Sequence, residues 1–546
     1  MKKFRFLILI SGVISTFGIL IFNLYQVQIQ KGSIYDAKAA SQNRLTGVLE
    51  PKRGTIYFTD RSGNLIPAAL NKEYPIVYAV PKEIEDIEEA AAKLNLILDI
   101  PIGDLAKKLS KRADAYELLA AKIKAAQIDK IKETAIKGVY LDTKNFRFYP
   151  FGTLGAHVLG FLGPSAKDDD VRGRYGLESY YDEYLEGKEG FFNGGKIIEP
   201  VSGSDLILTI DRNIQAQAEE ILRNLVSTHS AKGGMVIVEE AKTGKILSLA
   251  NDPTFDPNNY SKSEVSTFLN PAIENIYEPG SVFKVITMSA GLDSGQIIPE
   301  MTFVDTGSLT LNGKTIKNWG EKIYGKVDMS GVLENSINTG AAFIERKTGH
   351  DTFYDYLIKF GFNRKTDIGL PGEVNGNLKS LEKNVREINF ATASFGQGIA
   401  VTAMELIQAI AAIGNDGILM KPYLLAKDGP QQTAQVIKSE TARQVAKMMA
   451  STVKKAQIAY IPNYTIAGKT GTAQVPNFKR GGYTDEFIHT FVGFAPAVNP
   501  KFIVLIRIDK PAVGGFAGLT VVPAFRELAE FIINYYNIPP DDLKKP

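Results

Sequence analysis

An apolar run of 20 residues near the start of the chain, from Phe6 to Tyr25, limits where the rest of the protein can fold. As a helix it would span roughly 30 Å, which matches the hydrocarbon core of a bilayer. Lys2, Lys3 and Arg5 precede the run, so we expect its leading side in the cytoplasm and the bulk of the chain outside. Because no small-x-small cleavage site follows it, we predict an uncleaved single-pass anchor rather than a signal peptide.

Composition narrows the possible chemistry of this 546-residue chain. Lys and Arg number 63 against 60 Asp and Glu, and no stretch combines dense basic residues with aromatics, which argues against a nucleic-acid partner. Cysteine is absent, which excludes thiol catalysis, disulfides and Cys-based zinc sites. The four histidines are scattered without metal-ligand spacing: His157, His229, His350 and His489. We expect each to be structural, with a catalytic histidine as the alternative, and we expect no metal and no cofactor. Catalysis is therefore expected to depend on Ser, Lys, Asp, Glu or Thr.

The length of the chain suggests that it is divided into three or four domains or segments. Residues 1–28 form the predicted cytoplasmic tip and anchor. Residues 29–204 read as an irregular mixed α/β pedestal, with a short strand at Thr55–Phe58 and amphipathic helices between Asp86 and Lys137. No catalytic constellation occurs in that spacer. Residues 205–538 form the next predicted domain, and 539–546 a loose tail.

The order of predicted strands and helices in residues 205–538 indicates an α+β fold. A strand at Leu206–Ile210 is followed by a helix at Arg212–Val226 and a hairpin of Gly234–Val238 with Lys245–Ala250. A largely helical middle comes next. The predicted C-terminal elements are strands at Tyr464–Val475, Phe487–Phe494 and Phe502–Ile508 and a helix at Val522–Tyr536. Strands at both ends, with helices inserted between them, imply one sheet completed by distant segments.

The first candidate for chemistry is the pair Ser281 and Lys284. Ser281 follows the turn sequence Glu278-Pro279-Gly280 and opens an apolar run. A helix there would place Lys284 one turn further on, on the same face as the serine. Burial lowers the pKa of a lysine, so this amine can act as a base for the hydroxyl. The alternative is an ordinary serine N-cap beside a lysine whose end reaches solvent.

Two further Ser-x-x-Lys pairs look unsuited to catalysis. Ser380 and Lys383 lie in a polar stretch. Ser451 and Lys454 end an amphipathic helix on its charged side. A solvated lysine stays protonated and activates nothing.

Two other short motifs occur three times each, and context selects one copy of each. Lys469-Thr470-Gly471-Thr472 lies within a predicted strand that has small residues where a ligand can approach. The copies at Lys242 and Lys347 are expected in a hairpin turn and at a helix end. A phosphate-loop interpretation of Lys469 fails, because the required first glycine is replaced and strand flanks the motif on both sides. Ser336-Ile337-Asn338 follows a predicted helix, and a capping turn is its simplest interpretation.

Taken in order, Ser281-x-x-Lys284, Ser336-x-Asn338 and Lys469-Thr470-Gly471 resemble the three motifs of the penicillin-binding protein and serine β-lactamase superfamily. Wider features resemble its class B members, which are monofunctional transpeptidases. These features are the short anchor and the segments Arg53-Gly54, Asp60-Arg61-x-Gly63, Gly176-Leu177-Glu178, Asp205–Asp211 and Ser394–Gly398. The resemblance covers nearly the whole chain. One departure is Ile337, where many relatives have a polar or small residue.

The resemblance implies a peptidoglycan D,D-transpeptidase whose catalytic domain has a five-stranded antiparallel sheet flanked by helices. Ser281 would attack the carbonyl between two terminal D-alanines of a stem peptide, Lys284 would take its proton, and Ser336 could relay it. Asn338 would orient Lys284 and the substrate. Which group is the general base stays open in this superfamily. In the third motif, Lys469, Thr470 and Thr472 would bind the terminal carboxylate, and Gly471 would line the site. The backbone N–H groups of Ser281 and Thr472 would form the oxyanion hole.

The implied partners are stem peptides, β-lactams as inhibitors, the membrane, and a polytopic glycan polymerase with division or elongation proteins. No glycosyltransferase-like domain precedes the spacer, so we expect no bifunctional polymerase. The residues do not decide between septal and lateral wall synthesis. Two alternatives remain. One is a β-lactamase or D,D-carboxypeptidase, in which water resolves the acyl-enzyme. The other is a non-catalytic β-lactam receptor or scaffold.

Overall fold

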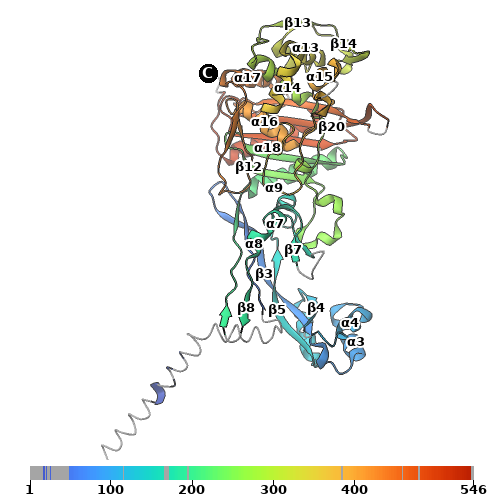
Figure 1. Cartoon of the computed structure of the whole chain (residues 1–546), viewed down its shortest axis with the longest axis vertical. Coiled ribbons are helices and arrows are strands. Elements are labelled where there is room, and N and C mark those ends of the chain that lie inside the picture. Colours follow the sequence, from blue (N-terminus) through green and yellow to red (C-terminus); the bar gives the residue numbers. More distant parts are fainter. Residues whose placement is uncertain are drawn as a thin grey trace, which may run out of the picture. The chain divides into compact units, whose positions relative to one another are not determined.

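The computed structural model describes residues 16–18, 20, 22, 25, 48–114, 116–164, 171–193, 196–382, 385–457, 459–477 and 480–542. The chain divides into two compact units, each assembled from segments distant in sequence (Figure 1). The first comprises Met1–Thr55, Leu70–Phe148 and Glu183–Asp205, and the second Ile56–Ala69, Tyr149–Asp182 and Leu206–Pro546. The predicted anchor falls largely outside the described residues. Within the part that is described, no helix has both the length and the apolar character needed to cross a membrane.

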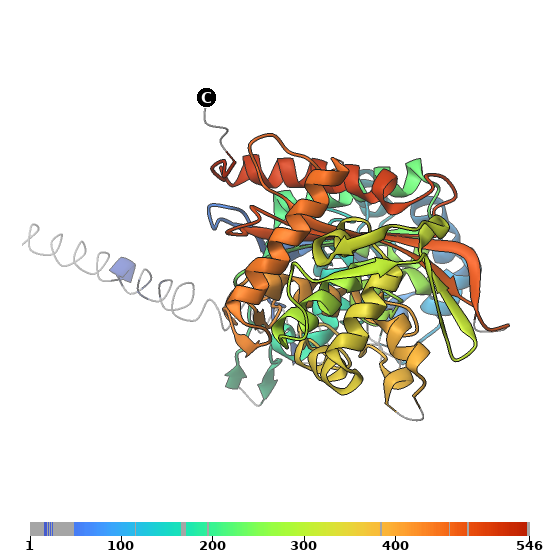
Figure 2. The ribbon, with the colours of Figure 1, turned by 90° about the horizontal axis from the view of Figure 1, so that it is seen from above.

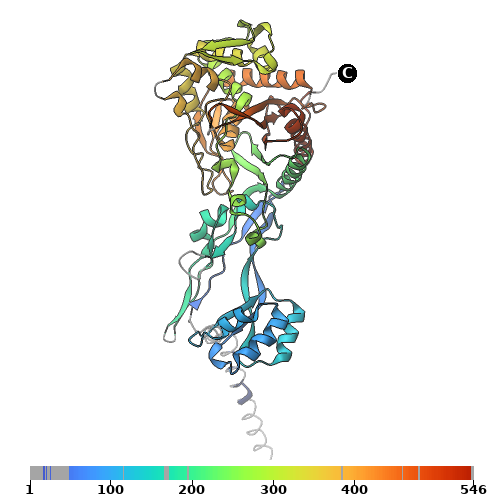
Figure 3. The same ribbon diagram turned by 90° about the vertical axis from the view of Figure 1, so that its right-hand side faces the viewer.

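The first unit is built on a sheet covered by three amphipathic helices (blue in Figure 3). Its strands are β3 (Leu65–Ala79, belonging to this unit from Leu70), β4 (Glu117–Ala121) and β5 (Val139–Phe148), and its helices α3 (Ile87–Leu98), α4 (Ile102–Leu109) and α5 (Ala125–Thr134). α3 begins where the Asp86 carboxylate accepts the Glu89 N–H at 3.0 Å. The helices predicted between Asp86 and Lys137 are therefore confirmed. A second sheet joins β1 (Val48–Leu49), β8 (Gly190–Asn193) and β9 (Lys196–Ile198).

The centre of the second unit is a five-stranded antiparallel sheet in the order β12-β11-β21-β20-β19. The bounds are β11 Gly233–Glu240, β12 Lys245–Asp252, β19 Ala467–Pro476, β20 Tyr483–Ala495 and β21 Phe502–Asp509. The predicted sheet completed by distant segments is confirmed, since the early hairpin pairs with strands more than 200 residues later. The predicted strand at Leu206 is β10 (Leu206–Asp211), but it pairs in parallel with β2 (Ile56–Thr59) outside this sheet.

One face of this sheet is covered by α9 (Arg212–Thr228) and α18 (Ala517–Tyr535, red in Figure 2). Alternate residues of β21 (Phe502, Val504, Ile506 and Ile508) are buried against them, as period-two geometry requires. α18 begins five residues before the predicted start at Val522. The earlier turn is stabilised because Ala517 and Val521 also belong to the buried core.

α16 (Ala403–Gly414) and α17 (Ser439–Ala456) also pack against the sheet, and α11 (Lys284–Asp293), which carries part of the site, packs against both of them. α16 is closed at its start by a capping box between Thr402 and Glu405. Further helices of the unit are α6 (Ala156–Leu159), α7 (Gly176–Tyr180), α10 (Pro271–Glu274), α12 (Met329–Glu334), α13 (Asn338–Thr348), α14 (His350–Lys359) and α15 (Glu387–Ala393). Helix α8 (Asp182–Glu186) belongs to the first unit from Glu183 onwards. The small paired strands of the second unit are β6 (Leu162–Pro164), β7 (Val171–Gly173), β13 (Thr302–Asp305), β14 (Ser308–Leu311), β15 (Lys314–Lys317), β16 (Gly325–Asp328), β17 (Ile418–Met420) and β18 (Gln432–Gln435).

Candidate active site

The turn that carries Ser281 is formed by two glycines in backbone contact. Gly280 has a φ of +58° and its N–H donates to the Gly396 carbonyl at 3.0 Å. A Cβ on Gly396 would lie 2.3 Å from the Gly280 oxygen, so no larger residue fits there. Ser281 lies on the 3-10 turn Gly280–Phe283, one turn before α11, and remains partly exposed. The serine thus stands at a helix start, as predicted, although the α-helix proper begins only at Lys284.

Lys284 is buried, with 1% of its surface exposed, and its amine lies among four oxygen atoms. The Nζ atom is 2.6 Å from the Ser336 carbonyl and 2.7 Å from Asn338 Oδ1. It is 3.0 Å from Ser281 Oγ and 3.1 Å from Ser336 Oγ. Burial, and secondarily the positive charge of Lys469, lower the pKa of Lys284 well below its ordinary value. The predicted buried lysine is therefore confirmed, and the alternative of a lysine whose end reaches solvent is excluded.

A neutral amine has two hydrogens and one lone pair. The two shortest contacts of Lys284 are to pure acceptors, the Ser336 carbonyl and the Asn338 amide oxygen. If the two hydrogens are donated there, the lone pair is left for the Ser281 hydroxyl at 3.0 Å. This arrangement can accept a proton from the serine oxygen.

Ser336 occupies the junction between α12 and α13 in a left-handed conformation, with φ of +53°. A non-glycine residue there is strained, and such strain collects at functional sites. The buried Ile337 that follows it is the N-cap residue of α13. Asn338 begins the helix and donates its Nδ2 to the Lys317 carbonyl at 2.9 Å, which fixes the oxygen towards Lys284. The motif is therefore more than a capping turn.

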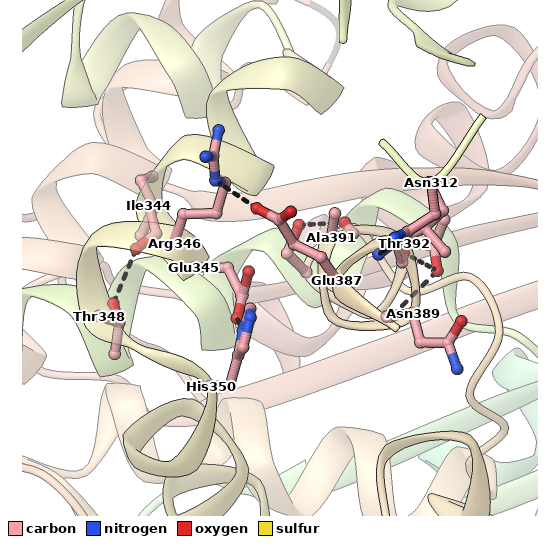
Figure 4. Close-up of polar contacts among 12 residues, drawn as sticks. Asn312, Ile344, Glu345, Arg346, Thr348, His350, Glu387, Asn389, Ala391 and Thr392 are labelled. Atoms are coloured by element: carbon pink, nitrogen blue, oxygen red, sulfur yellow. Dashed lines mark hydrogen bonds and ion pairs between the residues drawn. The ribbon is translucent and has the colours of Figure 1, made fainter. Parts of the chain in front are cut away.

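The opposite end of α13 is held by two polar contacts (Figure 4). His350 Nδ1 lies 2.6 Å from the Glu345 carboxylate, and Arg346 forms an ion pair of 2.9 Å with Glu387 of α15. The Glu345 side chain is fully buried, and burial raises its pKa. These contacts anchor the helix that positions Asn338.

Strand β19 closes the site from the edge of the sheet. Lys469 is 2% exposed, and its Nζ donates to Ser336 Oγ at 3.1 Å and to the Thr470 carbonyl at 3.0 Å. Burial lowers the pKa of Lys469 to about 8. A Cβ on Gly471 would lie 2.9 Å from the Pro279 carbonyl, so glycine lets the strand touch the nucleophile turn. Thr472 is partly buried, and its hydroxyl accepts the Ala517 N–H at 3.2 Å.

The structure thus joins Ser281, Lys284, Ser336, Asn338 and Lys469 in one hydrogen-bonded cluster, with Thr470, Gly471 and Thr472 on the adjoining strand.

The competing motif copies serve other roles. Ser451 Oγ donates to Glu334 at 2.5 Å, and Ser380 Oγ donates to the Gly398 carbonyl at 2.6 Å. Lys383 lies outside the described residues. Lys242 lies in the predicted hairpin turn, and Lys347 in the last turn of α13.

Sequence reasoning missed the role of Glu278 at this site. Its carboxylate accepts the Gly398 N–H at 2.9 Å and the Tyr483 hydroxyl at 3.0 Å. Burial raises the pKa of Glu278. Glu278 thus links the turn that carries Ser281 to the loop after α15 and to the β19–β20 hairpin. Its position three residues before Ser281 is a signal, but its partners lie more than 100 residues away in the chain.

Comparison with known proteins agrees with this geometry. The family model described as the penicillin binding protein transpeptidase domain matches residues 234–530, and that of the penicillin-binding protein dimerisation domain matches 48–203. The chain belongs to the penicillin-binding protein transpeptidase family. Among relatives in this family, stage V sporulation protein D of Bacillus subtilis is 32% identical over 93% of this chain and 82% of that protein. The peptidoglycan D,D-transpeptidase FtsI of Escherichia coli is 28% identical over 99% and 93%.

The fold is also that of solved family members. Penicillin binding protein 3 of Mycobacterium tuberculosis, in complex with aztreonam, superimposes with a TM-score of 0.70 at 27% identity, covering 90% of this chain and 98% of that one. The α+β architecture with its antiparallel sheet, expected from the resemblance, is confirmed.

Proposed function

We propose that this protein is a peptidoglycan D,D-transpeptidase that forms an acyl-enzyme on Ser281 and is inhibited by β-lactams. The observation that carries the assignment is the buried Lys284 amine, 3.0 Å from Ser281 Oγ and held by Ser336 and Asn338. A partly exposed serine is activated as a nucleophile when a lysine with a lowered pKa lies beside it.

In the acylation step Ser281 Oγ bonds to the carbonyl carbon of the penultimate D-alanine, and its proton passes to Lys284 Nζ. The carbon–nitrogen bond to the terminal D-alanine then breaks. The leaving amine takes a proton from Ser336 Oγ, which is replenished from Lys284 at 3.1 Å. The amine of a second stem peptide attacks the ester and gives up a proton to Lys284 Nζ, the bond to Ser281 breaks, and Ser281 Oγ takes that proton from Lys284 at 3.0 Å. This order makes Lys284 first a base and then an acid.

The third motif would bind the charged parts of the substrate. Lys469, still mostly protonated at pH 7 with a pKa of about 8, would attract the terminal carboxylate, with hydroxyls from Thr470 and Thr472. The Thr472 hydroxyl already accepts an N–H, so its own proton is left to donate. Backbone N–H groups of Ser281 and Thr472 would stabilise the oxyanion, at about 3–4 kcal/mol for each donor.

Mass spectrometry of the penicillin-treated protein tests the assignment. Wild type and Ser380→Ala, in which the serine of a competing motif is removed, should gain one penicilloyl group, whereas Ser281→Ala should gain none. A stable adduct on another serine would refute the site. Rapid release of hydrolysed penicillin, rather than a lasting adduct, would favour the β-lactamase alternative. Normal wall cross-linking in cells that contain only Ser281→Ala would favour the scaffold alternative.

We further propose the cellular setting that the sequence indicates. The apolar run Phe6–Tyr25 would be a single-pass anchor with a cytoplasmic N-terminus. Residues 29–204 would act as the pedestal and 205–538 as the catalytic domain. A polytopic glycan polymerase and division or elongation proteins would be the partners. Alkaline extraction of membranes tests the anchor, because a peripheral protein would be released.

A further inference from the structure

A polar hollow of about 210 Å³ lies in the second unit, and the proposed mechanism does not use it. Tyr180 and Tyr181, at the end of α7, line it together with Asp367, Lys421 and Asp428. Tyr180 is 52% exposed, so its ring does not contribute to a core. Burial raises the pKa of Tyr181 to about 12, and the nearby Asp428 adds to this shift, so its hydroxyl stays protonated.

The lining indicates an uncharged ligand with many hydroxyl groups. Two carboxylates face one lysine in it, which disfavours a phosphate or another anion. Tyrosine combines an apolar ring face with a polar tip, and the Asp and Lys groups supply hydrogen-bond acceptors and donors. A sugar ring presents the complementary surfaces, with C–H groups on its face and hydroxyls around its edge. The volume is below that of a drug-sized pocket and suits a single ring.

A second hollow of about 280 Å³ adjoins the first, because Tyr423 lines both. Its lining again mixes carboxylate and cation, from Asp60, Arg61 and Lys245. Two neighbouring ring-sized hollows with similar chemistry fit consecutive units of a linear polymer better than an isolated small molecule.

We propose that these hollows bind adjacent N-acetylated sugar rings of the wall glycan strand, apart from the catalytic cluster that processes the stem peptide. The inference rests on the proposed function for the identity of the polymer. Binding the strand raises the local concentration of its stem peptides at Ser281 without adding contacts to the reacting bond.

Titration of the full-length protein with tetra-N-acetylchitotetraose, a peptide-free oligomer of such sugars, tests the site by ligand-observed NMR. Wild type should bind saturably. Tyr180→Ala should weaken binding about fivefold, the value of one aromatic contact, and Asp428→Asn should weaken it similarly. Tyr460→Ala is the matched control, since Tyr460 is 51% exposed and does not line either hollow. Absence of saturable binding, or wild-type affinity in both Tyr180→Ala and Asp428→Asn, would overturn the proposal.

Labelled penicillin separates this proposal from the proposed function. All three variants should be acylated at the wild-type rate, because none touches the cluster around Ser281. If wild type binds the oligosaccharide but is not acylated, the transpeptidase assignment fails and the sugar site stands. With glycan strands that carry stem peptides, Tyr180→Ala should raise KM and leave kcat unchanged, while isolated stem peptides should react equally well with both proteins. A lowered kcat with isolated peptides would contradict a role confined to the strand.

Discussion

Raising the pH should slow acylation of this protein through loss of the Lys469 charge. The pKa of Lys469 is lowered to about 8 by burial, so about nine-tenths of the molecules carry the charge at pH 7 and about one-tenth at pH 9. If the charged form binds the carboxylate of a β-lactam, the acylation rate constant should fall about tenfold over those two units. At the acid end the rate should fall as Lys284 becomes protonated.

The two amines are coupled, which gives the prediction a second part. The charge of Lys469 helps to lower the pKa of Lys284. Lys469→Met removes that charge, so the pKa of Lys284 should rise and the acid limb should move to higher pH. Because the two groups titrate as a pair, the measured limbs belong to the pair and not to either residue alone.

Stopped-flow measurement of acylation by a fluorescent penicillin from pH 5 to pH 10 checks both parts. The methyl ester of the same penicillin is the control, because it lacks the carboxylate and should lose the alkaline limb while keeping the acid one. A wild-type rate that stays constant or rises between pH 7 and pH 9 would refute the reasoning. An unchanged acid limb in Lys469→Met would refute the coupling.

Three more outcomes follow from individual contacts. Asn338→Ala removes the hydrogen bonds to Lys284 and to the Lys317 carbonyl and should slow penicillin acylation roughly 10- to 100-fold while lowering stability by only about 1–2 kcal/mol, and a wild-type rate would contradict the positioning role. Gly471→Ala places a Cβ 2.9 Å from the Pro279 carbonyl and should lower the free energy of unfolding by about 1–3 kcal/mol in calorimetry. An unchanged free energy would contradict this, because it would mean that the turn carrying Ser281 moves away without cost. Burial raises the pKa of Glu239 to about 8 from 4.5, so the unfolded chain ionises first and stability should fall as pH rises between those values, by up to about 1.4 kcal/mol per unit. Glu239→Gln should remove this dependence, and equal differences in Tm between variant and wild type at pH 5 and pH 8 would contradict it.

The surroundings of Lys284 could be predicted only in part from its neighbours in the sequence. The apolar neighbours Phe283 and Val285 predicted its burial, and helical spacing predicted its closeness to Ser281. Its amine is also held by Asn338 and its pKa lowered further by the charge of Lys469, and these residues are 54 and 185 positions further along the chain. No local pattern reports that two distant segments bring an amide oxygen and a second cation to one amine.

Local periodicity was enough to predict the main strands and the helices of the pedestal, and the family resemblance of three ordered motifs predicted the members of the hydrogen-bonded cluster around Ser281. Hydrophobic spacing and turn residues act over a few positions, so they can be read directly from the chain. Tertiary structure alone decided that β10 pairs with β2, that Gly280 and Gly396 meet backbone to backbone, and that Glu278 links three segments. Those features depend on which surfaces are buried together, and burial is a property of the folded chain as a whole.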